Sequence, residues 1–304
     1  MPVKRARAIY AISPSGAIED HARIERAIAW LGAAGFSVRL DRSALAMHQR
    51  FAGQDRTRLG AFQRAAASEC GIVMATRGGY GLTRYLRHLD FAALARAGKQ
   101  WVGLSDFTAF HLAMLAKAGA VTWAGPCLAA GFGAEAGGVD PTTVGSFQDM
   151  VEGTLEAVGF ATRGNDGLEA EGVLWGGNLS MVCTLLGTPF FPQVKGGVLF
   201  LEDVNEHPFR IERMLTQLLH AGVLDRQRAI LIGHVNGYRS TPNDRGFDLP
   251  TVWRWLARQT RTPIVHGLPF GHAEPVLTLP HGAKVGLAVE RGTAYLVLPH
   301  GHRH

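Results

Sequence analysis

Residues 100–119 read QWVGLSDFTAFHLAMLAKAG and predict a strand that turns directly into a helix. The apolar run at 101–104 is typical of a buried strand, and apolar residues recur at helical spacing from Asp106 until Gly119. Ser105 is therefore expected at a strand-to-helix corner, where its hydroxyl and the first amides of the helix can face one ligand. The same position suits a simple helix N-cap, and the serine becomes a nucleophile only if a base can reach it.

Segments that precede residues 100–119 predict further strand–helix units. Residues 8–12 are typical of a first strand, a helical pattern follows over 17–34, and 36–40 predict a second strand. Residues 71–75 are interpreted as another buried strand. Strands that alternate with helices favour a parallel sheet covered by helices, so the predicted fold class of this half is α/β.

A glycine-rich loop follows the strand predicted at 71–75. Gly78, Gly79 and Gly81 allow the backbone to approach a ligand closely, with amide groups available for an anion. The loop lacks the Gly-Lys-Ser/Thr of a P-loop and the Gly-x-Gly-x-x-Gly spacing of a dinucleotide fold. Parallel neighbouring strands would bring it to the same sheet edge as Ser105, where its amides could complete an oxyanion hole. An ordinary strand-to-helix turn is the alternative.

The second half of the chain has a different pattern. A last helical segment is predicted at 142–158, and the polar stretch at 159–167 predicts a linker, so the expected domains are residues 1–160 and 161–304. One helix is predicted to begin at Pro208, because proline suits a first turn and apolar residues follow at helical spacing. Short apolar or alternating runs predict a smaller, β-rich mixed domain, with strands at 172–175, 198–201, 229–232, 264–267, 276–279, 285–289 and 294–298.

Two polar side chains in this half lie at or just beyond the ends of predicted strands. Glu202 closes one apolar run, and His272 follows another after a short loop. With Ser105 as nucleophile, they supply an orienting acid (Glu202) and a base (His272), so the three groups follow the chain order Ser, Glu, His. The chain has 13 histidines, however, so other bases are available, and the acidic neighbours Asp203 and Glu206 would also suit a solvated loop.

Other histidines could be considered as metal ligands. The Glu206-His207 pair and the terminal tract at 300–304 lack a His-x-x-x-His pair and a second ligand set, so no metal or other cofactor is predicted. The terminal tract is expected to be a flexible tail. The three cysteines are widely spaced and predict reduced thiols.

Composition limits the class of protein. No apolar run reaches about 18 residues, and residues 1–11 lack the apolar core of a secretory signal, so a cytoplasmic protein without a membrane partner is expected. The net charge of +6 could favour nucleic acid, but the arginines are scattered and form no basic run with interleaved aromatics. A substrate that carries carboxylates is the favoured partner, since a positive surface would steer it.

Six motifs are distributed from about residue 12 to about residue 281. They are Ser-Pro-Ser-Gly (13–16), Arg-Gly-Gly-Tyr-Gly (77–81), Gly-Leu-Ser-Asp-Phe-Thr (103–108), Trp-Gly-Gly-Asn-Leu (175–179), Leu-Glu-Asp-Val-Asn-Glu-His-Pro-Phe-Arg (201–210) and Phe-Gly-His (270–272). Their combination resembles the LD-carboxypeptidase family of serine peptidases, and more closely its cytoplasmic muramoyltetrapeptide carboxypeptidases of murein recycling. The ten-residue motif is long enough to be specific.

The resemblance implies a role for particular residues. It implies Ser105 as nucleophile, His272 as base and Glu202 as orienting acid, with the amides of Gly79 and Asp106 as the oxyanion hole. It further implies a Rossmann-like amino-terminal domain, a β-rich carboxyl-terminal domain and a homodimer. Three side chains are candidates for the substrate pocket: Arg77, Trp175 and Asn178.

The implied reaction is hydrolysis of the bond between an L-centre, in meso-diaminopimelate or lysine, and the terminal D-alanine of a murein tetrapeptide. An immunity-type peptidase that cleaves acylated nucleotide antibiotics is the alternative within the family. A non-catalytic protein that binds anionic peptides is the alternative from another class.

Overall fold

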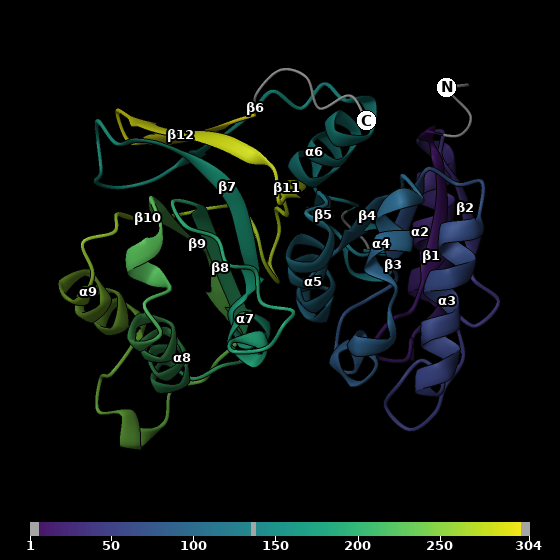
Figure 1. Cartoon of the computed structure of the whole chain (residues 1–304), viewed down its shortest axis with the longest axis horizontal. Helices are drawn as coiled ribbons and strands as arrows, with labels where there is room; N and C mark the ends of the chain where they lie inside the picture. Colours follow the sequence, from purple (N-terminus) through teal and green to yellow (C-terminus); the bar gives the residue numbers. More distant parts are fainter. Residues whose placement is uncertain (1–5, 135–137, 299–304) are drawn as a thin grey trace. The chain divides into compact units, whose positions relative to one another are not determined.

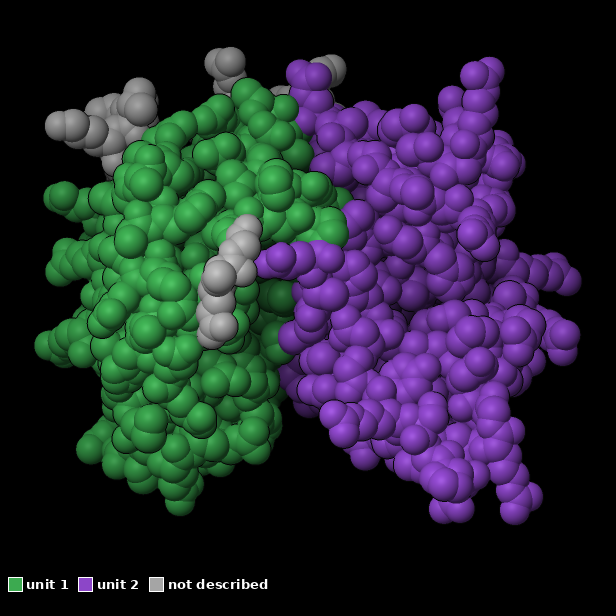
Figure 2. Space-filling view, turned by 180° about the vertical axis from the view of Figure 1, so that it is seen from behind, with its two compact units in different colours: residues 1–155, 275–282, 302–304 green, residues 156–274, 283–301 purple. Residues whose placement is uncertain are grey.

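The computed structural model describes residues 6–134 and 138–298, which form two compact units. Unit 1 comprises the described residues up to Leu155 together with Pro275–Gly282, and unit 2 comprises Glu156–Glu274 and the described residues from Ala283 onward. Figure 2 gives each unit its own colour. The chain returns to unit 1 at 275–282, whereas the sequence analysis expects a single boundary after residue 160. The terminal histidine tract lies outside the described residues.

Unit 1 is built on a six-stranded sheet in the order β11-β5-β4-β3-β1-β2 (Figure 1). Its first five strands in sequence are parallel, and the edge strand β11 pairs antiparallel with β5. The predicted parallel α/β fold is thereby confirmed. The strands are β1 (Ala8–Ile12), β2 (Ser37–Leu40), β3 (Ile72–Ala75), β4 (Gln100–Gly103), β5 (Thr122–Ala124) and β11 (Leu279–His281).

Helices cover both faces of this sheet. One face packs on α2 (His21–Ala33), α6 (Pro141–Glu152) and a π-helical turn at Leu128–Phe132, around Ile9, Ile72 and Val102 from the strands. The other packs on α3 (Asp55–Ala67), α4 (Phe91–Arg96) and α5 (Thr108–Ala118), where the ring of Phe62 stacks on Trp101 and tilts against Phe110. Alternate strand residues therefore fill two separate apolar layers, as expected for a doubly covered parallel sheet.

Three boundaries in unit 1 differ from the prediction. Helix α2 begins at His21 rather than at residue 17, because the side chain of Asp20 accepts a hydrogen bond from the Ala22 amide and caps it. The glycine loop leads into two short 3₁₀ turns, Leu82–Arg84 and Leu86–His88, before α4. Helix α6 stops at Glu152, where Gly153 takes the left-handed backbone of a helix C-cap.

Unit 2 contains a seven-stranded mixed sheet in the order β10-β9-β8-β7-β12-β13-β6. Strands β7 to β10 are parallel neighbours, whereas β12, β13 and β6 pair antiparallel. The mixed sheet agrees with the prediction. Its strands are β6 (Ala157–Ala161), β7 (Glu169–Asn178), β8 (Val198–Val204), β9 (Ala229–Asn236), β10 (Ile264–His266), β12 (Lys284–Glu290) and β13 (Thr293–Val297).

Two predictions for this half are wrong. Residues 159–161 of the expected linker belong to strand β6, which pairs with β13 as an edge strand of the sheet. The single expected helix, α8 (Pro208–His220), is accompanied by α7 (Leu179–Leu185) and α9 (Leu249–Gln259). Among the helices of the described residues, none is long and apolar enough to cross a membrane.

Candidate active site

Ser105 lies two residues beyond the end of β4 and begins a 3₁₀ turn, Ser105–Phe107, that continues into α5. Its φ angle is +66°, in the left-handed region that non-glycine residues adopt only at a cost of about 1–3 kcal/mol. The surrounding core holds it there: Phe107 is fully buried, and a Cβ on Gly103 would lie 2.5 Å from the Phe107 ring. Ser105 itself remains partly exposed. This is the strained, accessible corner typical of a nucleophile.

The glycine loop contacts this serine directly. A Cβ added to Gly78 would lie 2.5 Å from Ser105 Cβ and 2.7 Å from its Oγ, so only glycine fits. The same point lies 3.3 Å from the Asp106 amide nitrogen. The pairing of β3 with β4 brings the loop to the serine, as the sequence analysis expects. The sequence did not indicate which glycine contacts Ser105. Gly79, which the family resemblance implies for the oxyanion hole, is exposed and has a φ angle of +109°.

The side chain of Asp106 joins three segments. It is 1% exposed, and its Oδ2 accepts hydrogen bonds from the Ser15 hydroxyl at 2.5 Å and from the Leu82 amide at 2.9 Å. Burial raises the pKa of the Asp106 carboxyl, and these hydrogen bonds act in the opposite direction. The Ser-Pro-Ser-Gly turn, the glycine loop and the serine corner therefore share one buried acceptor.

A second buried group, the guanidinium of Arg58, contacts the Ser-Pro-Ser-Gly turn. The guanidinium of Arg58 lies 4.7 Å from the Phe51 ring centroid and 5.0 Å from that of Tyr85, and it donates to the Pro14 carbonyl at 3.3 Å. The Tyr85 hydroxyl donates to the same carbonyl at 2.7 Å. Sequence reasoning missed Arg58, because an arginine in a helical pattern normally predicts an exposed face.

Unit 2 contains a hydrogen-bonded acid–base pair. Glu202 on β8 is fully buried, and its Oε2 lies 2.7 Å from Nδ1 of His272. Because a carboxylate only accepts, Nδ1 carries the proton and Nε2 keeps its lone pair. Burial lowers the pKa of His272, but the hydrogen bond and charge of Glu202, together with the charge of Asp203, outweigh it and raise the pKa overall. This is the oriented imidazole that a general base requires.

The turn before His272 is fitted to this pair. Gly271 has φ +136°, and a Cβ there would lie 3.1 Å from Oε2 of Glu202 and 3.0 Å from Cβ of His234. The glycine of the Phe-Gly-His motif therefore lets the chain pass close to the carboxylate, which places the imidazole on it.

The three predicted pocket residues have different surroundings. Arg77 is exposed, and its Nη1 donates to the Ala17 carbonyl at 3.1 Å. Trp175 is fully buried, and its indole nitrogen donates to Gln227 at 3.0 Å, which places it in the core of unit 2 instead of on a binding surface. The amide of Asn178 donates to Oε1 of Glu202 at 3.2 Å.

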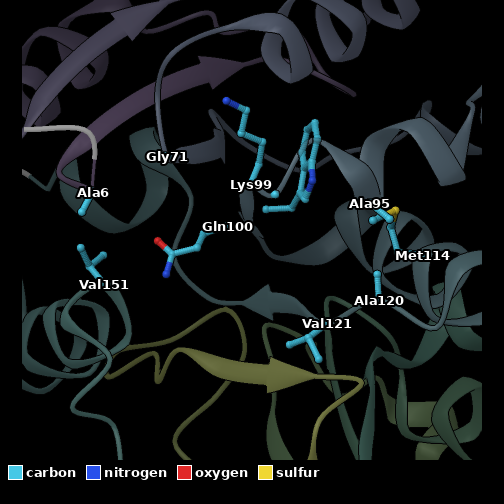
Figure 3. Close-up of a pocket in the computed structure, with 11 residues that line it drawn as sticks. Ala6, Gly71, Ala95, Lys99, Gln100, Met114, Ala120, Val121 and Val151 are labelled. Carbon is cyan, nitrogen blue, oxygen red and sulfur yellow. The ribbon is translucent and has the colours of Figure 1, made fainter. Parts of the chain in front are cut away.

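Unit 1 contains a cavity of about 420 Å³, and the residues that line it are drawn in Figure 3. Gln100 and Val121, which line it, stand at the amino ends of β4 and β5, whereas Ser105 follows the carboxyl end of β4. The Lys99 ammonium is engaged by the Cys70 carbonyl at 2.8 Å. The walls of the cavity are mostly apolar. Because it lies at the opposite end of β4 from Ser105, it is separate from the candidate active site.

A left-handed serine beside a glycine loop, and a histidine oriented by a buried glutamate, are components of a serine hydrolase. Comparison with known families agrees with this class. The model of the LD-carboxypeptidase N-terminal domain matches residues 9–125, and that of the LD-carboxypeptidase C-terminal domain matches residues 171–287.

Individual relatives point in the same direction. A probable murein peptide carboxypeptidase of Bacillus subtilis is 31% identical over 91% of this chain and 88% of its own length. The crystal structure of muramoyltetrapeptide carboxypeptidase from Oxalobacter formigenes is 39% identical, with a TM-score of 0.88 over 96% of this chain and 99% of that one. The microcin C7 self-immunity protein of Escherichia coli is 27% identical over 71% of this chain and 70% of its own. The chain therefore belongs to the LD-carboxypeptidase family and is a serine-type carboxypeptidase.

Proposed function

We propose that this carboxypeptidase removes the terminal D-alanine from murein tetrapeptides, by hydrolysing its bond to the L-centre of meso-diaminopimelate or lysine. The observation that carries the proposal is the buried Glu202–His272 pair, which holds an imidazole with Nε2 available as a base. The named activities of the Bacillus and Oxalobacter relatives support the substrate class. The proposal includes a cytoplasmic location in peptidoglycan recycling and a homodimer.

The proposed mechanism assigns one step to each group. Nε2 of His272 removes the proton of the Ser105 hydroxyl, and the oxygen attacks the scissile carbonyl. The amides of Gly79 and Asp106 stabilise the negative charge that develops on the carbonyl oxygen. Glu202 keeps the imidazole in one tautomer and stabilises its charged form. His272 then protonates the departing D-alanine amine, and water hydrolyses the acyl-enzyme.

Recognition of the terminal carboxylate needs a cation. We assign this role to Arg77, because it is exposed and adjoins Gly78, which contacts Ser105. A guanidinium can pair with a carboxylate through two parallel hydrogen bonds. The net charge of +6 would also favour encounter with anionic muropeptides.

The test is release of D-alanine from L-Ala-D-Glu-meso-diaminopimelate-D-Ala by purified protein. Ser105→Ala should lower kcat/KM by about 10⁴-fold or more, because only binding and oxyanion stabilisation remain. Ser68→Ala is the matched control, since the Ser68 hydroxyl donates to the Ala65 carbonyl at the end of α3 and its loss should leave turnover unchanged. Turnover by Ser105→Ala close to that of the control would refute the proposed nucleophile.

An acylated nucleotide is the second candidate substrate. Tyr80, in the glycine loop, is 42% exposed, and its ring could stack on a nucleobase. Incubation with an aminoacyl sulfamoyl nucleotide and with the tetrapeptide separates the two candidates by which one is hydrolysed. Stoichiometric binding of peptide without hydrolysis of either would instead indicate the non-catalytic binding protein.

A further inference from the structure

Asn178 occupies a junction between a strand and a helix in unit 2. It is the last residue of β7 and the N-cap of α7, where its Oδ1 accepts a hydrogen bond from the Met181 amide at 3.2 Å. Its Nδ2 donates to Oε1 of Glu202 at 3.2 Å. The side chain is thus engaged at both ends, and the residue is 6% exposed.

The backbone brings this amide to the carboxylate. Asn178 and Glu202 are direct partners in the parallel pairing of β7 with β8. The two preceding residues, Gly176 and Gly177, have φ angles of +128° and +119°. A Cβ on Gly176 would lie 2.0 Å from the Phe200 carbonyl oxygen, so glycine is required for this close approach of the two strands.

The hydrogen bonds of the Glu202 carboxylate to His272 and Asn178 use different oxygens. Oε2 faces Nδ1 of His272, and Oε1 faces the amide of Asn178. A fully buried carboxylate that loses a donor has no bulk water to replace it, so it must rotate, admit water or take up a proton. Each of these changes would alter the hydrogen bond that orients His272.

We propose that Asn178 is a positioning residue, which fixes the Glu202 carboxylate on His272 by coupling it to the start of α7. The role rests on the proposed function, because it acts through the assigned acid and base. It differs from the substrate-binding role that the sequence analysis considers for Asn178.

A neighbouring contact holds the same helix independently of Glu202. Oδ2 of Asp203 accepts from the amide and the hydroxyl of Ser180, at 2.9 and 2.8 Å. The start of α7 is therefore tied to β8 twice, and only Asn178 reaches Glu202. The titratable groups around His272 are Glu202 and Asp203 from β8, with His234 from β9 close to Glu202.

The main test variant is Asn178→Ser. Serine is as good an N-cap as asparagine, so α7 should remain folded, but its shorter side chain leaves Oε1 of Glu202 without the amide donor. Asp248→Ala is the matched control, because it removes the cap of α9, where Asp248 accepts from the Thr251 amide at 2.9 Å, and leaves Glu202 untouched. Circular dichroism and thermal unfolding verify that both variants are folded.

Two readouts separate positioning from substrate binding. In Asn178→Ser, kcat for D-alanine release should fall about tenfold or more with little change in KM. The pKa of His272, followed by NMR and assigned with His272→Gln, should differ from the wild-type value: it rises where the Glu202 carboxylate stays charged and is no longer shared with the amide, and it falls where that carboxylate takes up a proton. Asp248→Ala should match wild type in kcat and in His272 titration.

An increase in KM with an unchanged His272 titration would overturn the proposal in favour of a substrate ligand. Unchanged kcat, KM and titration in Asn178→Ser would overturn it as well. A wild-type protein that releases no D-alanine would overturn the proposed function, whereas the His272 titration would still decide whether Asn178 acts on the Glu202–His272 pair.

Discussion

At the scale of single residues, the candidate site depends on glycines at positions where any larger side chain would clash with a neighbour. Gly78 faces the Ser105 side chain, Gly176 faces a carbonyl of β8, and Gly271 faces Glu202. The glycines of these short motifs are therefore explained by close approach of the backbone to a neighbouring side chain or carbonyl. The strain of Ser105, at φ +66°, is held by the buried Phe107 beside it.

Replacement of Gly78 by Ala tests the closest of these contacts. The added methyl would lie 2.5 Å from Ser105 Cβ, so the serine or the loop must move. We expect kcat/KM to fall by about tenfold to a hundredfold, since overpacking displaces the nucleophile. Gly32→Ala is the control, because a Cβ there meets nothing within 4 Å. Activity of Gly78→Ala equal to that of the control, in a folded protein, would contradict the geometry.

At the scale of elements, a buried histidine pair joins α5 to the sheet that positions Ser105. His111 on α5 stacks on His281 of β11, with ring centroids 5.4 Å apart. Nε2 of His111 lies 3.0 Å from the Gly103 carbonyl, which only accepts, so Nδ1 accepts from the Thr122 hydroxyl at 2.8 Å. Burial lowers the pKa of His111 to about 4, and burial with the neighbouring His111 lowers that of His281.

This pair predicts a loss of stability in acid. The folded pKa of His111 lies below its ordinary value of 6.5, so its contribution is fully present above 6.5 and is lost as pH falls toward 4. Wild type should lose about 2 kcal/mol more unfolding free energy than His111→Gln between pH 7.5 and 5.0. Urea unfolding at both pH values measures this difference. Equal losses in the two proteins would show that His111 is not held neutral.

The helices and strands differ in how well the sequence alone predicts them. Strands β1, β3 and β4 of unit 1 were predictable as short apolar runs, and helices α2 and α5 were predictable from apolar residues at helical spacing that stop near a glycine. Strand β6 was not, since it is a five-residue edge strand with alternate residues exposed, and the glycine-bearing polar stretch at 159–167 begins within it. Helix α7 is short and follows a strand without a polar break, whereas α9 carries an Asp248 cap and Pro250 that the sequence did contain.

At the candidate site, sequence patterns predict the proposed reactive side chains but not those that support them. Ser105 and His272 follow strands and Glu202 lies within β8, close to the end of the apolar run that the sequence shows. Arg58 and the carboxyl of Asp106 are buried polar groups, and only the fold reveals their partners. The contact of Asn178 with Glu202 was not predictable, because the register of β7 with β8, rather than composition, brings the two side chains together.

At the scale of the whole molecule, the proposed catalytic groups come from two compact units. In the proposed mechanism, unit 1 provides Ser105 and the amides of the glycine loop, and unit 2 provides the imidazole of His272. The central claim is that Ser105 and His272 act as one catalytic unit.

The most direct measurement of this claim is kcat/KM for D-alanine release by Ser105→Ala, His272→Gln and the double variant. When two residues act as one catalytic unit, removal of either one abolishes their joint effect, so the rate losses do not multiply. We therefore predict that the double variant is no slower than the slower single variant. Losses that multiply in the double variant would mean that the serine and the histidine act independently, which would contradict the account.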